Sequence, residues 1–275
     1  MKVVIEDNEN NILFGIAQTL VLTGVDCIVW NPRYKSTFDM CHEQKPDLII
    51  VSANLYRNIG GELMAANNLY QNSKMIVYGL DLEKQEKTIF YPKISFANLI
   101  LNNGINNVDS YNSDVALICN DLEQNDAPKI SEIINRFVKT EGLKNKGLKI
   151  YGSSKVRINS PFCVGNINKY SYGYVYRHTK LLLDLHGDHY YNSVLHGNLC
   201  VLVDDIFDDK RIEEYLEFVE NRDQELFKTG RDHIINTFNN FVGTAAVINS
   251  AGFKDEASKI KKFGEDFINA NWNNS

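Results

Sequence analysis

The stretch that decides the fold runs from residue 177 to residue 205, RHTKLLLDLHGDHYYNSVLHGNLCVLVDD. Two apolar runs, 181–185 and 199–203, flank a short helix-compatible segment at 190–195. Continuous apolar runs of about five residues around a short helix are typical of a βαβ unit in a buried parallel sheet. We therefore predict an α/β protein built on parallel sheets.

A dense set of polar side chains follows the first apolar run. In open parallel sheets, ligands bind just beyond the carboxyl ends of the strands, often against a helix N-terminus. We therefore expect a binding site at this edge. The polar residues there are His186, Asp188, His189, Tyr190, Tyr191 and Asn192.

Strand and helix patterns alternate along most of the chain, which predicts doubly wound parallel sheets. We expect two Rossmann-like domains that face a cleft: 1–120, and 121–252 as the nucleotide-sugar side. A last helical segment, 253–275, is expected to cross back to the first domain. The predicted strands are 2–6, 26–30, 47–51, 74–79, 115–119, 148–151, 181–185 and 199–203, and the main predicted helices are 12–22, 36–43, 61–70, 128–140, 170–178, 190–195, 209–221, 224–238, 241–251 and 255–269.

Bulk properties narrow the function classes. The 275 residues carry a net charge of −6, which argues against nucleic-acid binding over the whole surface. No apolar run approaches the roughly 20 residues of a membrane-spanning helix. The five cysteines are scattered without CxxC spacing, and the first residues resemble a strand instead of a signal peptide. We expect a cytoplasmic protein with reduced thiols; its abundant asparagine suggests an AT-rich bacterial, phage or large-virus genome.

Several common motifs are absent from the sequence. The chain contains neither GxGxxG nor a P-loop, which disfavours NAD-dependent redox chemistry and ATP hydrolysis. Glu6 and Asp7 after the first strand are typical of a phosphoacceptor receiver, but the third strand is followed by Ser52-Ala53-Asn54, without the required aspartate.

A metal site built from the cluster His186, His189 and His196 is an alternative. The competing interpretation of His196 is a helix cap beside Gly197.

A polar loop follows the predicted strand 148–151. Gly152 is followed by Ser153 and the cations Lys155 and Arg157. Hydroxyls, amide groups and cations at a strand end can hold a pyrophosphate through charge-assisted hydrogen bonds. An ordinary solvated loop is the alternative interpretation.

The second half of the chain resembles the C-terminal domain of GT-B glycosyltransferases, most of all the spore-maturation-type family. The resemblance covers roughly residues 148–245. Its motifs are a strand ending in Ile150-Tyr151-Gly152, the loop Cys163-Val164-Gly165-Asn166, the tyrosine-rich segment 170–176, the run Lys180-Leu-Leu-Leu-Asp184, the helix–glycine–strand unit 190–203, and a helix with Glu225-Leu226-Phe227 and Gly230-Arg231 followed by Phe238.

The resemblance implies transfer of a sugar from a nucleotide diphosphate sugar, with a UDP-sugar favoured, and without a metal. The base would lie against Val164–Asn166 and the ribose near Asn192. The pyrophosphate would meet Gly152, Ser153, Lys155 and Arg157, together with His189 and Tyr190. No other cofactor is implied. The acceptor stays open between a glycan, a protein, a small molecule and modified DNA.

The sequence departs from the family pattern at two positions. His189 stands where the family has arginine, and Asn192 stands where it has glutamate. Either the donor is bound in an altered way, or the protein is an inactive nucleotide- or sugar-binding relative. A general base for an inverting reaction should come from the N-terminal domain. Asp7 is our candidate, with His42 and Asp81 behind it.

Overall fold

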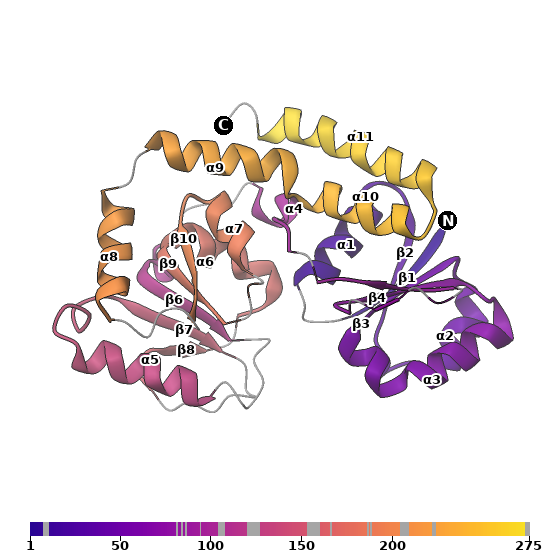
Figure 1. The fold of residues 1–275 in the computed structure, drawn as a ribbon, viewed down its shortest axis with the longest axis horizontal. Helices are drawn as coiled ribbons and strands as arrows, with labels where there is room; N and C mark the ends of the chain where they lie inside the picture. The colour runs from indigo at the N-terminus through magenta and orange to yellow at the C-terminus, as the bar shows by residue number, and fades with distance from the viewer. Residues whose placement is uncertain are drawn as a thin grey trace. The chain divides into compact units, whose positions relative to one another are not determined.

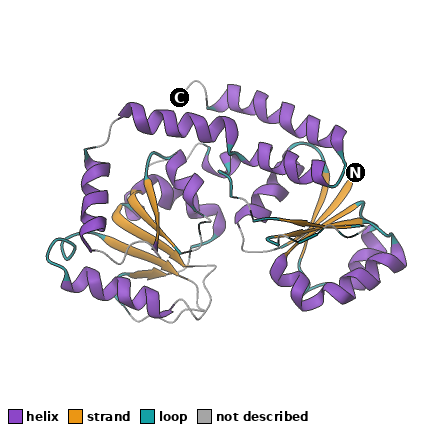
Figure 2. Cartoon of the chain, viewed as in Figure 1, coloured by secondary structure: helices purple, strands orange, loops and turns teal. Residues whose placement is uncertain are grey.

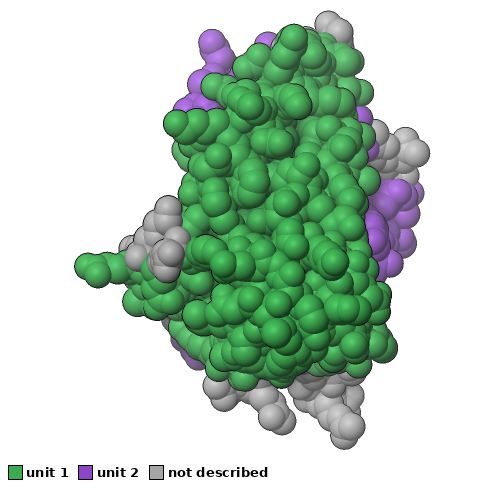
Figure 3. Space-filling model, turned by 90° about the vertical axis from the view of Figure 1, so that its right-hand side faces the viewer, with its two compact units in different colours: residues 1–100, 238–275 green, residues 101–237 purple. Residues whose placement is uncertain are grey.

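The computed structural model describes most of the chain, and its ribbon is drawn in Figures 1 and 2. The chain forms two compact units, residues 1–100 with 238–275, and residues 101–237. Figure 3 shows the two segments of the first unit merged into one green body. The described residues are 1–7, 11–80, 82, 83, 85, 87–93, 95–103, 108–119, 127–152, 160–165, 167–185, 187, 189–203, 209–221 and 224–272.

The first unit contains a five-stranded sheet in the order β2-β1-β3-β4-β5, in which every pairing is parallel. The central strand β3 is buried along its whole length, as its apolar sequence LIIVS requires. The strands are β1 (Lys2–Glu6), β2 (Asp26–Trp30), β3 (Leu48–Ser52), β4 (Lys74–Tyr78) and β5 (Thr88–Tyr91), and the helices are α1 (Asn11–Leu22), α2 (Thr37–Gln44), α3 (Ala53–Tyr70), α10 (Asn240–Ser250) and α11 (Lys254–Asn271).

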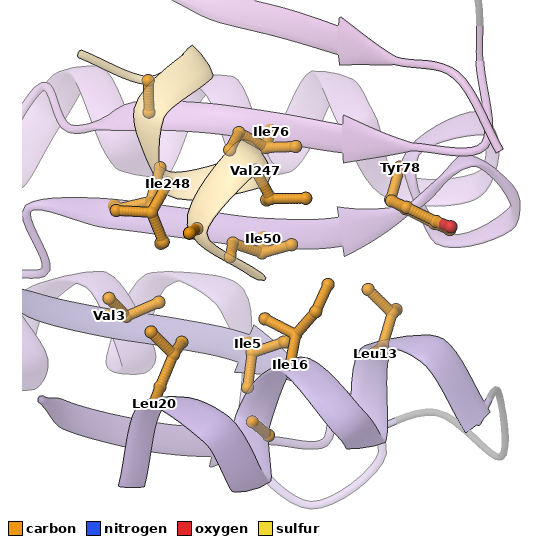
Figure 4. Packing of buried hydrophobic residues seen from close by; sticks show 14 of the residues in the cluster. Val3, Ile5, Leu13, Ile16, Leu20, Ile50, Ile76, Tyr78, Val247 and Ile248 are labelled. Atoms are coloured by element: carbon orange, nitrogen blue, oxygen red, sulfur yellow. The ribbon is translucent and has the colours of Figure 1, made fainter. Parts of the chain in front are cut away.

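Helices cover both faces of this sheet (Figure 1). Because successive side chains of a strand point to opposite faces, Val3 and Ile5 pack on one side and Val4 on the other. Figure 4 shows the first side, where Ile16 of α1 and Val247 of α10 meet the sheet. Helices α2 and α3 cover the second side.

The second unit contains another five-stranded parallel sheet, in the order β10-β9-β6-β7-β8. Helices α5 and α8 pack on one face, and α6 packs on the other. The strands are β6 (Ser113–Cys119), β7 (Leu148–Gly152), β8 (Cys163–Gly165), β9 (Thr179–Asp184) and β10 (Leu199–Leu202), and the helices are α5 (Ala127–Lys139), α6 (Tyr172–His178), α7 (Tyr190–Leu195), α8 (Asp209–Glu220) and α9 (Gln224–Thr237).

The predicted α/β class with two parallel sheets is confirmed, but the expected domain limits need correction. The strand Ser113–Cys119, assigned to the first domain, pairs with β7 and β9 in the second sheet. Residues 238–252, assigned to the second domain, belong to the first unit, because the apolar face of α10 completes that core. The C-terminal helix α11 lies in the first unit as well.

The chain passes from one unit to the other after residue 100 and again after residue 237. Next to these two points, backbone hydrogen bonds join residues of the first unit. The backbone N–H of Ala97 donates to the carbonyl of Phe238 at 2.8 Å, and Asn240 N–H donates to the carbonyl of Ala97 at 2.8 Å. The short helix α4 (Leu99–Asn102) begins here, and Leu99 N–H donates to Asn240 Oδ1 at 2.8 Å. Among the described residues, no helix is both long and apolar enough to cross a membrane.

The contact between α10 and α11 leaves no room for a side chain at Gly264. A β-carbon there would lie 2.5 Å from Phe241 Cβ, an atom that a change of rotamer cannot move away. We expect Gly264→Ala to lower the free energy of unfolding by about 1–3 kcal/mol, despite the better helix propensity of alanine. At Gly61 of α3 the same β-carbon would meet nothing within 4 Å. Gly61→Ala should therefore add about 0.5–1 kcal/mol in the same urea titration, and equal effects of the two changes would contradict this packing.

Candidate functional site

The candidate site lies at the carboxyl edge of the second sheet. Its strands are parallel, so the ends of β7 and β9 lie on the same edge, separated by β6. Gly152 is the last residue of β7, and Val164, which is half exposed, lies in the neighbouring strand β8. The remaining predicted contacts from these loops, Ser153, Lys155, Arg157 and Asn166, lie outside the described residues.

The loop after β9 is held by the buried carboxylate of Asp184. Its Oδ1 accepts the backbone N–H of Gly187 at 2.9 Å, and its Oδ2 accepts that of His189 at 2.8 Å. Gly187 has a φ of +75°, a conformation that glycine adopts without strain. Burial and the nearby Asp184 carboxylate raise the pKa of the Cys200 thiol well above its usual range, so this thiol stays protonated.

His189 precedes α7 and is buried, with 5% of its surface exposed. Its Nδ1 shares a hydrogen bond of 2.7 Å with the hydroxyl of Tyr176, in which either atom can be the donor. The imidazole also meets the ring of Tyr172 edge to face, with centroids 5.6 Å apart. The side chain that we expected at the phosphates is therefore fixed by two tyrosines of α6.

Tyr190 has the most accessible surface of the three predicted contacts that follow β9. It is 46% exposed, whereas His189 and Asn192 are 5% and 3% exposed. Its ring packs edge to face against Tyr191, with centroids 5.3 Å apart. The start of α7 thus offers an aromatic surface to solvent.

Asn192 takes part in a buried amide network. Its Oδ1 accepts a hydrogen bond from Asn102 Nδ2 at 2.8 Å, while Asn102 Oδ1 lies 2.9 Å from His196 Nε2. His196 is the C-cap of α7 and precedes Gly197, whose φ is +75°. The predicted cap position of His196 is confirmed; its bond to Asn102 was not predicted.

His196 is neutral in the ordinary pH range. Burial, together with the charges of Arg177 and Arg231 and the nearby His178, lowers its pKa to about 3. A neutral imidazole carries one N–H, and Asn102 already donates through Nδ2. The His196 Nε2–H therefore donates to Asn102 Oδ1.

We considered three histidines as a metal site, and two of them form hydrogen bonds to other side chains. His189 bonds to Tyr176 and His196 bonds to Asn102. His186 lies outside the described residues. Within the part of the chain that the structure describes, no group of three His, Cys, Asp or Glu side chains is placed to hold an ion.

The candidates for a general base lie in the first unit. Asp7 follows β1 at the carboxyl edge of that sheet, is exposed, and accepts a hydrogen bond of 3.3 Å from Asn31 Nδ2. His42 lies in the last turn of α2, and its ring packs against Tyr70 with centroids 5.0 Å apart. A helix that follows a strand starts near the carboxyl edge and runs back, so His42 lies toward the opposite edge. Asp81 is outside the described residues.

A surface cavity of about 550 Å³ opens at the other edge of the second sheet, near the first residues of β9. Lys180 bridges Asp114 at 2.8 Å and Glu220 at 2.9 Å beside it. These ion pairs already use the cation, and the cavity lies at the edge opposite the predicted site. The lining residues are Asn112, Arg177, His178, Thr179, Lys180, Asn198, Val219 and Glu220.

Comparison with known proteins shows the fold of the chain and nothing finer. No protein-family model and no curated protein matches it. The structure of S. aureus MnaA with UDP shares 9% identity with a TM-score of 0.55, covering 92% of this chain and 98% of that one. A Listeria monocytogenes protein assigned as a UDP-N-acetylglucosamine 2-epimerase shares 7% identity with a TM-score of 0.50, covering 90% and 96%. The chain has a GT-B-like fold.

A glycosyltransferase is also among the similar structures. The structure titled as the glycotransferase of kitacinnamycin shares 10% identity with a TM-score of 0.45, covering 90% of this chain and 97% of that one. A TM-score of 0.45 supports no conclusion about the activity of this chain. The resemblance to the spore-maturation-type family therefore stays a hypothesis, while the fold that it implied is confirmed.

Sequence reasoning missed the roles of three residues in the site. Tyr176 and Asn102 hold His189 and Asn192, yet no spacing rule connects residues that lie 13 and 90 positions apart. Asp184 appeared only within the apolar run 181–185 and as the last residue of the motif 180–184. The signal that could have identified it is an aspartate directly before a glycine-containing loop, a common way to satisfy turn N–H groups.

The two hydrogen bonds that the Asp184 carboxylate accepts predict the effect of replacing it with an amide. An asparagine can accept only one of the two backbone N–H groups and turns its own NH₂ toward the other. We expect Asp184→Asn to lower the free energy of unfolding by about 2–3 kcal/mol in a urea titration. Asp266→Asn changes an exposed carboxylate of α11 and should leave stability within about 0.5 kcal/mol. Equal stabilities of the two variants would contradict the role of Asp184.

The depressed pKa of His196 predicts a dependence of stability on pH. The unfolded histidine binds a proton below about 6.5, whereas the folded one binds it only below about 3. Between these values the unfolded state binds more protons, so stability falls as the pH is lowered, by up to about 1.4 kcal/mol per pH unit. His196→Gln keeps an N–H for Asn102 but cannot titrate.

We expect the free energy of unfolding of His196→Gln to depend less steeply on pH than that of the wild type between pH of about 4 and 6. His233→Gln, which changes an exposed histidine of α9, should keep the steep dependence because His196 is still present. Parallel curves for wild type and His196→Gln would show that the imidazole titrates equally in both states.

Proposed function

We propose that this protein binds a nucleotide diphosphate sugar, with a UDP-sugar favoured, at the carboxyl edge of its second sheet, and transfers the sugar to an acceptor. The observation that carries the proposal is the loop after β9. Asp184 holds its backbone so that His189 and Tyr190 stand at a strand end of a GT-B-like fold. S. aureus MnaA, which shares this fold, was solved with UDP, and this supports the choice of nucleotide.

The proposed donor site combines groups that follow three strands. The pyrophosphate would meet Ser153, Lys155 and Arg157 after β7 and the start of α7, and the base would lie against Val164 in β8. Cations and N–H groups at these positions match a diphosphate, because charge-assisted hydrogen bonds are the strongest that a phosphate can receive. Of these residues, Ser153, Lys155 and Arg157 enter the proposal on the sequence alone.

The proposed reaction breaks the bond between the anomeric carbon and the diphosphate oxygen and forms one from that carbon to an acceptor hydroxyl. The leaving UDP gains negative charge, which Lys155 and Arg157 would stabilise without a metal. The acceptor hydroxyl loses its proton to a base, for which Asp7 is our candidate. The acceptor can be a glycan, a protein, a small molecule or modified DNA.

A second candidate function is epimerisation of the UDP-sugar itself. It is favoured by the similarity to the Listeria monocytogenes protein assigned as a UDP-N-acetylglucosamine 2-epimerase. Both candidates need the same donor site. A nucleotide-sugar-binding protein without turnover is the third outcome that the experiment must separate, since His189 and Asn192 replace the charged residues of the family pattern.

We expect UDP or a UDP-sugar to raise the melting temperature, and GDP, ADP and CMP to raise it less. A ligand at about one hundred times its Kd adds roughly 2.7 kcal/mol of stability, which corresponds to several degrees. Lys155→Ala should weaken binding about tenfold or more, because it removes a charge-assisted bond. Lys144→Ala, which removes an exposed lysine paired with Glu141, is the matched control and should bind as the wild type does. No shift with any nucleotide would contradict the proposed function.

The reaction is then assigned by its product from UDP-N-acetylglucosamine and UDP-glucose. Proton NMR would detect released UDP and a glycosylated acceptor for transfer, or a second UDP-sugar for epimerisation. Binding without either product would indicate a protein that recognises the nucleotide sugar without converting it.

A further inference from the structure

The side chain of Asn102 bridges Asn192 of α7 and His196, the C-cap of the same helix. It is buried, with 3% of its surface exposed, and stands at the end of α4. Its Nδ2 donates to Asn192 Oδ1 at 2.8 Å, and its Oδ1 accepts from His196 Nε2 at 2.9 Å. A single amide thus donates to α7 and accepts from the C-cap of that helix.

The two partners lie on the same side of α7. Asn192 and His196 are four residues apart, a spacing that places side chains one above the other on a helix. At the other end of the helix, Asp184 accepts the backbone N–H of His189. Helix α7 has only six residues, which form too few internal hydrogen bonds to keep it in place. Asp184 therefore holds its start and Asn102 holds its end.

The first residue of α4 is held by hydrogen bonds within the first unit. Helix α4 has four residues, and its first residue, Leu99, donates its backbone N–H to Asn240 Oδ1 at 2.8 Å. Asn240 is fully buried and also donates from Nδ2 to Thr19 Oγ1 at 2.7 Å.

We propose that Asn102 is a positioning residue of the nucleotide-sugar site, which fixes α7 through Asn192 and His196 and so places His189 and Tyr190 at the strand edge. The inference rests on the proposed function, because it assigns the purpose of α7 to donor binding. A binding group must be held within about 0.5 Å of its productive position, which a short helix reaches only when supporting bonds fix it.

The bridge depends on a neutral His196. The groups that face it are Arg177 and His178 from α6 and Arg231 from α9, and the ring of Tyr176 stacks on it with centroids 6.5 Å apart. Burial and the cationic side chains of Arg177 and Arg231 oppose protonation of the imidazole. A neutral amide at position 102 accepts the N–H of His196 without attracting a second proton.

The experiment compares wild type, Asn102→Ala and the matched control Asn103→Ala, which removes the exposed neighbouring amide. Hydrogen exchange of the α7 backbone amides is measured without ligand, and the Kd for UDP-N-acetylglucosamine is measured by calorimetry. We expect Asn102→Ala to exchange faster at α7 and to bind about tenfold more weakly, because the alanine removes both hydrogen bonds that hold the end of the helix. Asn103→Ala should match the wild type in both.

A third variant, Asn102→Asp, separates positioning from a general loss of packing. Its carboxylate keeps the shape of the amide but favours the protonated form of His196, which NMR follows directly. We expect the ratio of its Kd to that of the wild type to change with pH in step with this titration. UDP-N-acetylglucosamine is suitable because its phosphate diesters stay ionised throughout the range. A ratio that does not vary with pH would overturn the proposal.

The outcomes also separate this proposal from the proposed function. If the wild type binds the nucleotide sugar while Asn102→Ala shows wild-type exchange at α7 and wild-type affinity, the positioning role is wrong and the proposed function stands. If the wild type binds no nucleotide, the proposed function is wrong and the assignment of Asn102 to a donor site falls with it, whatever the exchange at α7.

Discussion

The second unit depends on how a buried carboxylate is satisfied at the end of β9. An isolated charge inside a protein is costly unless hydrogen bonds replace the lost water. Asp184, with 2% of its surface exposed, receives the backbone N–H groups of Gly187 and His189. These bonds turn the chain from a buried strand into α7 within five residues. The carboxylate that stabilises the turn thereby also determines where the polar residues after it lie.

The sequence predicted those parts of the fold that rest on burial along a strand or helix. The apolar runs 181–185 and 199–203 correspond to β9 (Thr179–Asp184) and β10 (Leu199–Leu202). Strand β5 was missed because the polar stretch around it has no period. Helix α3 starts at Ala53, eight residues before the predicted start, because the hydroxyl of Ser52 accepts the N–H of Leu55 and caps it.

The candidate site was predictable in its location but not in its internal bonds. A parallel sheet brings strand ends to one edge, so the sequence order alone placed His189 and Asn192 there. Which side chains face a ligand and which face each other depends on residues distant in sequence. The hydroxyl of Tyr176 and the amide of Asn102 have no periodicity that could indicate their partners. Residue type therefore indicated polarity at this edge, and only the structure indicated how that polarity is used.

Buried amides are the connectors that this asparagine-rich chain uses in both units. Asn67 bonds both backbone groups of Ser73, and Asn240 joins Leu99 to Thr19. An amide offers a donor and an acceptor without a charge, so its burial costs much less than that of a carboxylate once both are used. At position 192 a glutamate would bring a negative charge into the space beside Asn102 and would favour protonation of His196. The asparagine at position 192 is thus compatible with a neutral His196 at the end of α7.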